Sequence, residues 1–159
     1  MTPDAPPIRI APEDPDSPAA RHCLLSFFAE LDARFDGGFD PGPGPHGTVF
    51  QAPGGCFLIA RRGEEILGCV GLVPVEDRAG TAEVKRLWVA QAARGTGLGA
   101  RLMAAIEAQA RAAGVSRLVL DTNGVLVEAV AFYRRAGWTA IPRYNANPYA
   151  QHWFARDLT

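Results

Sequence analysis

The 159-residue sequence predicts a single domain of the mixed α+β class, spanning residues 1–159 with a disordered lead at 1–7. Three apolar runs between residues 56 and 89, separated by short turns, are typical of an antiparallel meander. The third run is followed by a helix-periodic segment and another apolar run, and strands joined by such a crossover are parallel. The sequence therefore predicts antiparallel strands that lead into one β–α–β unit.

The composition limits which binding partners and which cellular compartment we expect for this protein. With 48% hydrophobic and 21% charged residues, the chain can bury a core and is not globally disordered. A net charge of −1 provides no clustered basic surface, so we expect no nucleic-acid partner. The apolar runs are much shorter than the roughly 20 residues of a membrane span, and Met1–Asp16 lacks the apolar region of a signal peptide. We therefore expect no membrane association and a cytoplasmic location.

The three cysteines, Cys23, Cys56 and Cys69, are odd in number and lack CxxC spacing. This pattern argues against both a disulfide framework and a zinc site. We expect reduced, mostly buried thiols and no metal.

The chain begins with a short strand at Ile8–Ile10 and continues into a helix. Ser17 is a good N-cap, and a proline follows it at the first helical position. The helix runs to about Phe35, and its apolar face is predicted from the three- and four-residue spacing of Leu24, Leu25, Phe28, Leu31 and Phe35. The segment Phe39–Gly47, rich in proline and glycine, is a loop. It is either a plain connector or a segment whose aromatic side chains line a substrate site.

The meander strands are expected at Cys56–Ala60, Ile66–Val75 and Thr81–Val89. Side chains alternate along a strand, so the third strand has two distinct faces. One face is predicted to carry Glu83, Lys85, Leu87 and Val89, and the other to carry Val84, Arg86 and Trp88.

A helix from Leu98 to about Gly114 and a buried strand at Arg117–Asp121 complete the β–α–β unit. Asn123 is placed to cap the next helix, which Gly137 ends. The side chains expected to face inward from that helix are Val127, Val130 and Ala131. Two closing segments, Trp138–Arg143 and Gln151–Asp157, flank a loop at Tyr144–Ala150.

Three alternating glycines, in the turn Arg94–Gly99, open the central helix. Uncovered N–H groups at a helix N-terminus attract phosphate, and glycine lets an anion approach the backbone. The turn is no P-loop, because it lacks the closing Gly-Lys-Ser/Thr. It does satisfy a dinucleotide-binding GxGxxA pattern, with Asp121 at a plausible ribose position. Against that interpretation, Ala90–Arg94 separate the strand from the glycines, and the strand itself is half polar.

The pattern Arg94-x-x-Gly97-x-Gly99 resembles the Arg/Gln-x-x-Gly-x-Gly/Ala signature of the GNAT superfamily of acyl-CoA N-acyltransferases. The segment Phe132–Trp138 is similar to the "FYxxxGF/Y" segment of that family. The resemblance covers about Cys56 to Leu158, with two small departures: glutamine at position 91 and tryptophan at 138. It implies a GNAT-like fold, a mainly antiparallel mixed sheet with a central splayed parallel strand pair flanked by helices.

The resemblance also implies a cosubstrate, acetyl-CoA, and no metal. The strand backbone expected to pair with pantetheine is that of Leu87, Trp88 and Val89. Asn123 is expected to touch the pantetheine arm. The pyrophosphate is expected on the main-chain amides of Arg94, Gly95, Thr96, Gly97, Leu98, Gly99 and Ala100.

The implied activity is transfer of an acetyl group to a primary amine by direct attack on the thioester. Glu83 is the expected general base, acting directly or through water, although a strand glutamate paired with Lys85 is an equally simple interpretation. Tyr133 is the expected acid at the thiolate, because a phenol with an ordinary pKa near 10 stays protonated at pH 7. The alternative interpretation is that Tyr133 is only an aromatic residue of the core.

No motif identifies the acceptor, which is a small-molecule or peptide amine. The candidate substrate-binding residues are Phe35, Phe39, Tyr144, Tyr149 and His152. His152 is also an alternative base or a packed, hydrogen-bonded histidine. A homodimer is one candidate assembly. Two other functions stay open: a non-catalytic acyl-CoA sensor and an NAD(P)-binding oxidoreductase.

Overall fold

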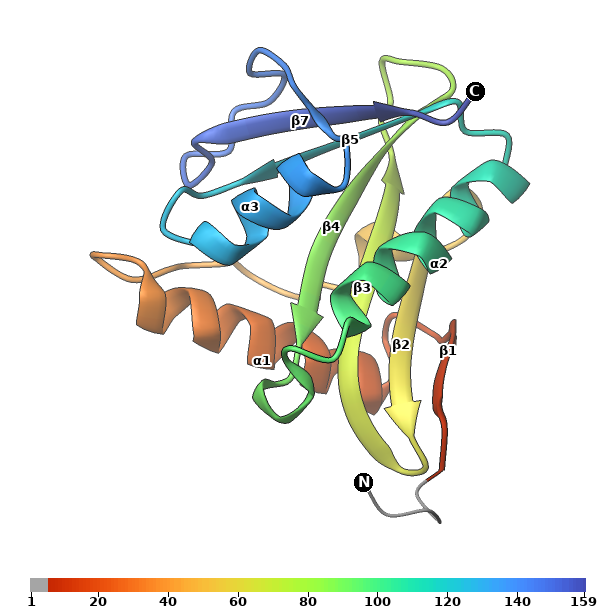
Figure 1. Ribbon diagram of the computed structural model, residues 1–159, viewed down its shortest axis with the longest axis vertical. Helices are drawn as coiled ribbons and strands as arrows, with labels where there is room; N and C mark the ends of the chain where they lie inside the picture. The colour runs from red at the N-terminus through yellow and green to blue at the C-terminus, as the bar shows by residue number, and fades with distance from the viewer. Residues whose placement is uncertain (1–5) are drawn as a thin grey trace.

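The computed structural model describes residues 6–159, so most of the expected disordered lead lies outside the described residues. Its elements are β1 (Ile8–Pro12), α1 (Pro18–Arg34), η1 (Thr48–Phe50), β2 (Cys56–Arg62), β3 (Glu65–Pro74), β4 (Thr81–Val89), η2 (Gln91–Ala93), α2 (Leu98–Ala112), β5 (Arg117–Thr122), α3 (Val127–Arg135), β6 (Thr139–Ala140) and β7 (His152–Asp157). The strands form one seven-stranded sheet in the order β1-β2-β3-β4-β5-β7-β6. Helix α1 covers one face of this sheet, and α2 and α3 cover the other (Figure 1).

Helix α1 forms where its capping signals predict. The Ser17 hydroxyl accepts a hydrogen bond from the Ala20 amide at 3.1 Å, and the next residue is the proline that opens the helix. Its buried residues are Ala20, Cys23, Leu24, Phe28 and Leu31. The apolar spacing also places Leu25 on this face, but 63% of it is exposed. Each helical residue turns by about 100°, so Leu25 is rotated away from the face that Leu24 buries.

The expected mixed sheet with a splayed parallel pair is confirmed. Within the described sheet β4 and β5 form the parallel pair, and they are joined only where Thr81–Glu83 lie beside Arg117–Val119. Beyond Glu83 the two strands diverge, and β5 and β7 turn away from β4 (Figure 1). The edge of β4 that faces β5 is therefore free of strand partners from Val84 onward.

A β-bulge in β4 changes the predicted faces of this strand. Lys85 lies opposite Gly71 and Trp88 lies opposite Cys69, so Arg86 and Leu87 together face one residue of β3. Arg86 has a φ of 63°, in the left-handed region.

The predicted faces are consequently wrong beyond the bulge. Val84, Leu87 and Val89 pack into the cluster under α2 and α3, whereas Trp88 packs into the cluster under α1. Arg86 also lies on the α1 side, where its guanidinium sits 5.1 Å from the centre of the Phe28 ring. The extra residue of the bulge reverses the side-chain alternation.

Helices α2 and α3 end at glycines, as predicted: Gly114 and Gly137, just after the two helices, have φ of 81° and 89°. Helix α3, in contrast, begins later than expected. Asn123 does not cap it: the Asn123 Oδ1 accepts a hydrogen bond from the Val125 amide at 2.8 Å and so closes a turn before the helix.

Two predictions about the last third of the chain are wrong in detail. Val127, expected to face inward, opens α3 with 64% of its surface exposed, and Val130 carries the contact with the core. The closing segment at Trp138–Arg143 contributes only the two-residue strand β6.

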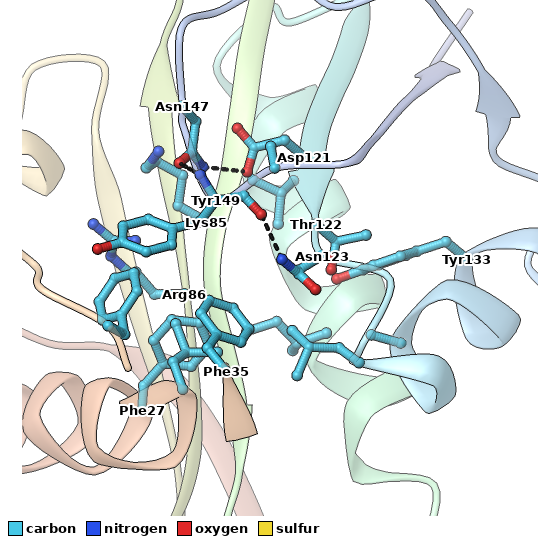
Figure 2. A pocket seen from close by; sticks show the side chains of 17 residues that line it. Phe27, Phe35, Lys85, Arg86, Asp121, Thr122, Asn123, Tyr133, Asn147 and Tyr149 are labelled. Carbon is cyan, nitrogen blue, oxygen red and sulfur yellow. Dashed lines mark hydrogen bonds between the residues drawn. The ribbon is translucent and has the colours of Figure 1, made fainter. Parts of the chain in front are cut away.

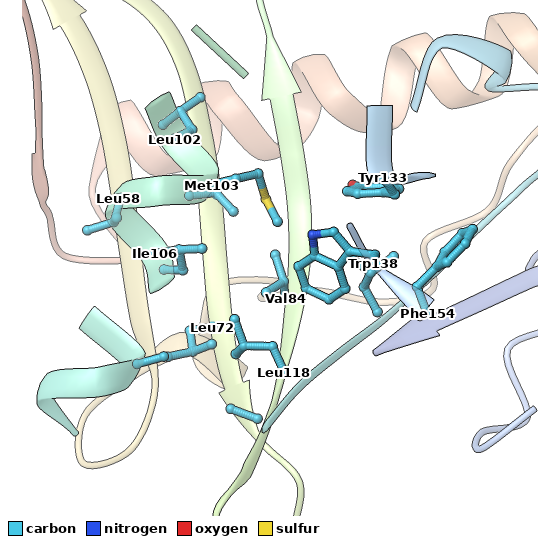
Figure 3. Packing of buried hydrophobic residues seen from close by; sticks show 14 of the residues in the cluster. Leu58, Leu72, Val84, Leu102, Met103, Ile106, Leu118, Tyr133, Trp138 and Phe154 are labelled. Carbon is cyan, nitrogen blue, oxygen red and sulfur yellow. The ribbon is translucent and has the colours of Figure 1, made fainter. Parts of the chain in front are cut away.

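The larger core lies between the sheet and α2–α3 (Figure 3). At its α3 end the Tyr133 ring lies 5.9 Å from both the Trp138 and the Phe154 rings, centre to centre. These aromatic contacts hold α3 against β7.

The cysteines are free thiols, as expected; two are buried and Cys56 is partly buried. Within residues 6–159, no helix has both the length and the hydropathy to cross a membrane.

Candidate active site

A cavity opens between α1 and the diverging ends of β4 and β5 (Figure 2). Its volume is about 760 Å³ when the space open to solvent is included. The side chains that line it are Phe27, Leu31, Phe35, Phe39, Val84, Lys85, Arg86, Leu87, Asp121, Thr122, Asn123, Leu126, Ala129, Tyr133, Asn147, Tyr149 and Ala150. One wall is thus aromatic, whereas the ends of the strands contribute polar and charged groups.

The cavity brings together most of the predicted acceptor and catalytic side chains. Phe35, Phe39, Tyr149 and Tyr133 line it, and so does Asn123, the residue expected at the pantetheine arm. Glu83, Tyr144 and His152 are not among the lining residues. His152 stacks on Phe154 at 6.3 Å between ring centres, on β7.

Aromatic rings from α1 and the following loop form the apolar wall. Tyr149 stacks on Phe35 at 5.7 Å and tilts against Phe39 at 4.7 Å, between ring centres. The Tyr149 hydroxyl accepts a hydrogen bond from the Asp40 amide at 3.0 Å, which ties this loop to the segment before β7. The loop after α1 is therefore part of the site rather than a plain connector.

Two carboxylates are joined through one amide at the polar end. The Asn145 Nδ2 donates to Asp121 Oδ2 at 2.6 Å and to Glu83 Oε2 at 3.3 Å. Asp121 also accepts from Asn147 at 3.1 Å, and its carboxylate lines the cavity (Figure 2). Glu83 lies outside the cavity lining, where it accepts from the Tyr144 hydroxyl at 2.5 Å and pairs with Lys85 at 3.3 Å.

Burial, together with the neighbouring Glu83 carboxylate, raises the pKa of Tyr144 well above its ordinary value. Tyr144 therefore stays a hydrogen-bond donor to Glu83 over the whole physiological range. Its raised pKa also makes the stability of the protein depend on pH in the alkaline range, because Tyr144 can ionise near pH 10 in the unfolded chain but not in the folded one.

We expect the free energy of unfolding to fall as pH rises above 10, and to fall less in Tyr144→Phe. Between pH 10 and pH 11 the wild type should lose about 1 kcal/mol more of its free energy of unfolding than the variant. The reason is that a pKa raised in the folded state contributes its full stabilisation only below the pKa that the group has in the unfolded chain. Urea unfolding followed by circular dichroism measures both slopes. The same pair compared between pH 7 and pH 9 is the control, because the phenol is protonated there in both states. Parallel slopes above pH 10 would contradict the assignment.

Tyr133 is buried, with 7% of its surface exposed, and its hydroxyl is directed toward the end of β5 at Thr122 and Asn123 (Figure 2). Burial, and secondarily the Asp121 carboxylate, raises the pKa of this phenol well above its usual range. Tyr133 is therefore held neutral, as a donor that can serve an anion developing in the cavity.

The glycine turn is built as the helix-terminus signal predicts. Gly95 and Gly97 have φ of 77° and 83°, and Gly97 immediately precedes α2. A Cβ placed at either position would meet no atom within 4 Å beyond its chain neighbours, so the backbone there faces open space. Such a surface fits an approaching anion. The Arg94 side chain is held by the Glu30 carboxylate at 2.6 Å and the Val89 carbonyl at 3.1 Å, which leaves the anion to the main chain.

Gly97→Ala is expected to weaken coenzyme A binding at least about tenfold, because a methyl group would meet the pyrophosphate. Gly114→Ala is the matched control: it has the same positive φ, the same open surroundings, and lies at the other end of α2. Both variants should lose about 1 kcal/mol of stability through backbone strain. Calorimetric titration with coenzyme A separates the two effects, and equal affinity for the two variants would remove the turn from the binding site.

Sequence patterns alone did not assign Asp121, Arg86 or Asn147 to the acceptor site. Asp121 had a usable signal, because it closes a buried strand that runs parallel to its neighbour, where binding residues gather. No signal in the sequence marked Arg86, since its place in the cavity depends on the bulge in β4.

The splayed strand pair and the glycine turn at the start of α2 are the features on which the resemblance to acyl-CoA N-acyltransferases rests, and the structure contains both. Residues 24–138 match the Acetyltransferase (GNAT) family. The IAA acetyltransferase of Azospirillum brasilense is 37% identical over 136 residues, which cover 84% of this chain and 85% of that protein. The chain belongs to the GNAT family and is an N-acetyltransferase.

Solved structures show the same fold. A GNAT-family acetyltransferase from Staphylococcus aureus Mu50 superposes with a TM-score of 0.82 at 18% identity, covering 96% of this chain and 100% of that one. N-acetylglutamate synthase from Neisseria gonorrhoeae, complexed with coenzyme A and L-arginine, gives 0.71 at 19% identity, covering 95% and 33%. The dinucleotide interpretation of the glycine turn is wrong, because it requires a doubly wound parallel sheet and the described strands are mostly antiparallel.

Proposed function

We propose that this enzyme uses acetyl-CoA to acetylate the primary amine of a small molecule. The observation that carries the proposal is the cavity in the splay of β4 and β5, which places a neutral phenol, the Asp121 carboxylate and an aromatic wall around one volume. Glu83, outside the cavity lining, is linked to Asp121 through Asn145. In the aromatic wall, Tyr149 joins the segment before β7 to the loop after α1 through its contacts with Phe39 and Asp40. Such a wall favours a small acceptor over a protein surface.

The chain's own groups fit the cosubstrate. The free edge of β4 at Leu87–Val89 would pair with the pantetheine arm, with Asn123 beside it. The amides of residues 94–100 would hold the pyrophosphate at the open surface of the glycine turn. Acetyl-CoA would supply the thioester that the amine attacks and the thiolate that leaves.

A primary amine needs a base, because with a pKa near 10.4 only about one molecule in 10³ is neutral at pH 7. We assign that role to Glu83, acting through water because its carboxylate stands behind the cavity wall. Asp121, which lines the cavity, holds the incoming ammonium group. The Tyr133 hydroxyl, which burial keeps protonated, donates a hydrogen bond to the departing thiolate, and the proton that the amine gives up leaves through water to Glu83.

Two measurements on the purified protein test this function. Calorimetric titration should show coenzyme A and acetyl-CoA binding, and a thiol-release assay with a panel of small primary amines should show acceptor-dependent release. Binding without release on any amine would identify a sensor instead, and failure to bind coenzyme A would overturn the proposal as a whole.

A further inference from the structure

The bulge in β4 places the side chain of Arg86 in the wall of the cavity. Arg86 lines the cavity, and its guanidinium lies over the Phe28 ring. Its Nε is buried and has no hydrogen-bond partner among residues 6–159. Burial lowers the pKa of the guanidinium, but arginine stays charged at every physiological pH. A buried cation whose donor is unmatched is costly unless an anion meets it.

The neighbouring carboxylates of the protein are engaged elsewhere. Glu83 and Asp121 act on Arg86 through space, without a hydrogen bond. Glu83 is occupied by Tyr144, Asn145 and Lys85, and Asp121 by the two asparagines of the loop before β7. No carboxylate of residues 6–159 forms an ion pair with Arg86, so an anion that pairs with it has to come from outside the described chain. Such an anion would meet the terminal nitrogens of the guanidinium, since Nε itself is buried.

The rest of the wall specifies what else that ligand carries. Asp121 offers an anionic group to an ammonium. The rings of Phe27, Phe35, Phe39 and Tyr149 offer an apolar surface. One cation, one anion and an aromatic wall around a common volume complement a molecule with a carboxylate, an amine and an apolar body.

We propose that the acceptor is a small amino carboxylate with an apolar or aromatic body, of the kind that hydrophobic amino acids represent. Its carboxylate pairs with Arg86, its amine lies at Asp121, and its body packs on the aromatic wall. This assignment rests on the proposed acetyl transfer and names the acceptor class of the same site. Arg86 is thereby the residue that selects acceptors with a carboxylate.

The test compares acceptors that differ only in the carboxylate. Phenylalanine is paired with phenethylamine, leucine with isopentylamine, and tryptophan with tryptamine, at saturating acetyl-CoA. For at least one pair, the wild-type kcat/KM should favour the amino acid at least about 30-fold, as expected for a buried charge pair. A preference for the decarboxylated amine in every pair would overturn the proposal, and this comparison needs no variant.

Arg86→Met then tests the residue. Methionine keeps an unbranched side chain at the same backbone φ but removes the charge, so the preference should fall to within about threefold of unity. The matched control is Arg62→Met, which removes an exposed charge from β2 outside the cavity and should keep the wild-type preference. A preference that survives in Arg86→Met would overturn the role of Arg86.

The two proposals fail in different ways. Protein that binds acetyl-CoA and acetylates only amines without a carboxylate keeps the proposed function and loses this acceptor class. Protein that binds no coenzyme A, by calorimetry, loses both. A melting curve with and without coenzyme A establishes that each variant is folded before its kinetics are compared.

Discussion

Replacing Glu83 with glutamine is expected to lower kcat about 100-fold at pH 7, within the range that a general base contributes. Glutamine keeps the shape of the side chain and an oxygen that accepts from the Tyr144 hydroxyl, so the local structure should persist. What would be lost is the proton acceptor that we propose for an amine that is almost entirely protonated at neutral pH. Steady-state kinetics at saturating acetyl-CoA, with an acceptor found by the thiol-release panel, measures the change.

The pH dependence distinguishes a lost base from a disturbed site. Activity of Glu83→Gln should rise about tenfold per pH unit between pH 7 and 9, because the neutral fraction of the acceptor rises by that factor. Glu13→Gln is the matched control, since Glu13 is an ion-paired carboxylate outside the cavity lining, bound to Arg61 at 2.8 Å. A Glu83→Gln enzyme with nearly wild-type kcat, alongside an inactive Asp121→Asn enzyme, would transfer the base role to Asp121.

Tyr133→Phe is expected to lower kcat at least about tenfold while acetyl-CoA affinity stays nearly the same. The variant removes a single buried hydroxyl directed at the end of β5 and keeps the ring that packs on Trp138 and Phe154. Because burial raises the pKa of this phenol, its donor does not titrate below pH 10. The ratio of wild-type to variant kcat should therefore be constant from pH 6 to pH 9.

Tyr149→Phe is the matched comparison, because it also removes a phenol hydroxyl from a residue of the cavity wall. That hydroxyl accepts from the Asp40 amide, so its loss should loosen the loop and raise the acceptor KM rather than lower kcat. An unchanged kcat in Tyr133→Phe would remove Tyr133 from the mechanism. A loss of equal size in both variants would indicate a general disturbance of the wall.

Local signals were enough for most of the secondary structure. The Ser17 cap, the left-handed glycines at 114 and 137 and the short turn between β2 and β3 act through neighbouring residues, and all formed as predicted. Leu25 and Val127 were misplaced because hydrophobicity and spacing do not say where a buried stripe ends.

The residues of the cavity were predicted from the sequence only where they belong to a local motif or a short segment. Tyr133 and the glycine turn belong to contiguous motifs, and Phe35, Phe39 and Tyr149 stand out in short segments rich in aromatic residues. The link from Asp121 through Asn145 to Glu83 joins three segments that are distant in sequence. No spacing rule connects them.

The sequence by itself determined the features on which we base the proposed donor site: a glycine turn at a helix start, a β–α–β unit, and the tyrosine that follows it. These features depend on backbone conformation and hydrogen bonds between near neighbours. Only the tertiary structure decided the acceptor side, because the β4 bulge at Arg86 exists through pairing with β3 and reverses the faces of the strand. That one extra residue moves a charge into the cavity and creates the surface on which we base the acceptor class.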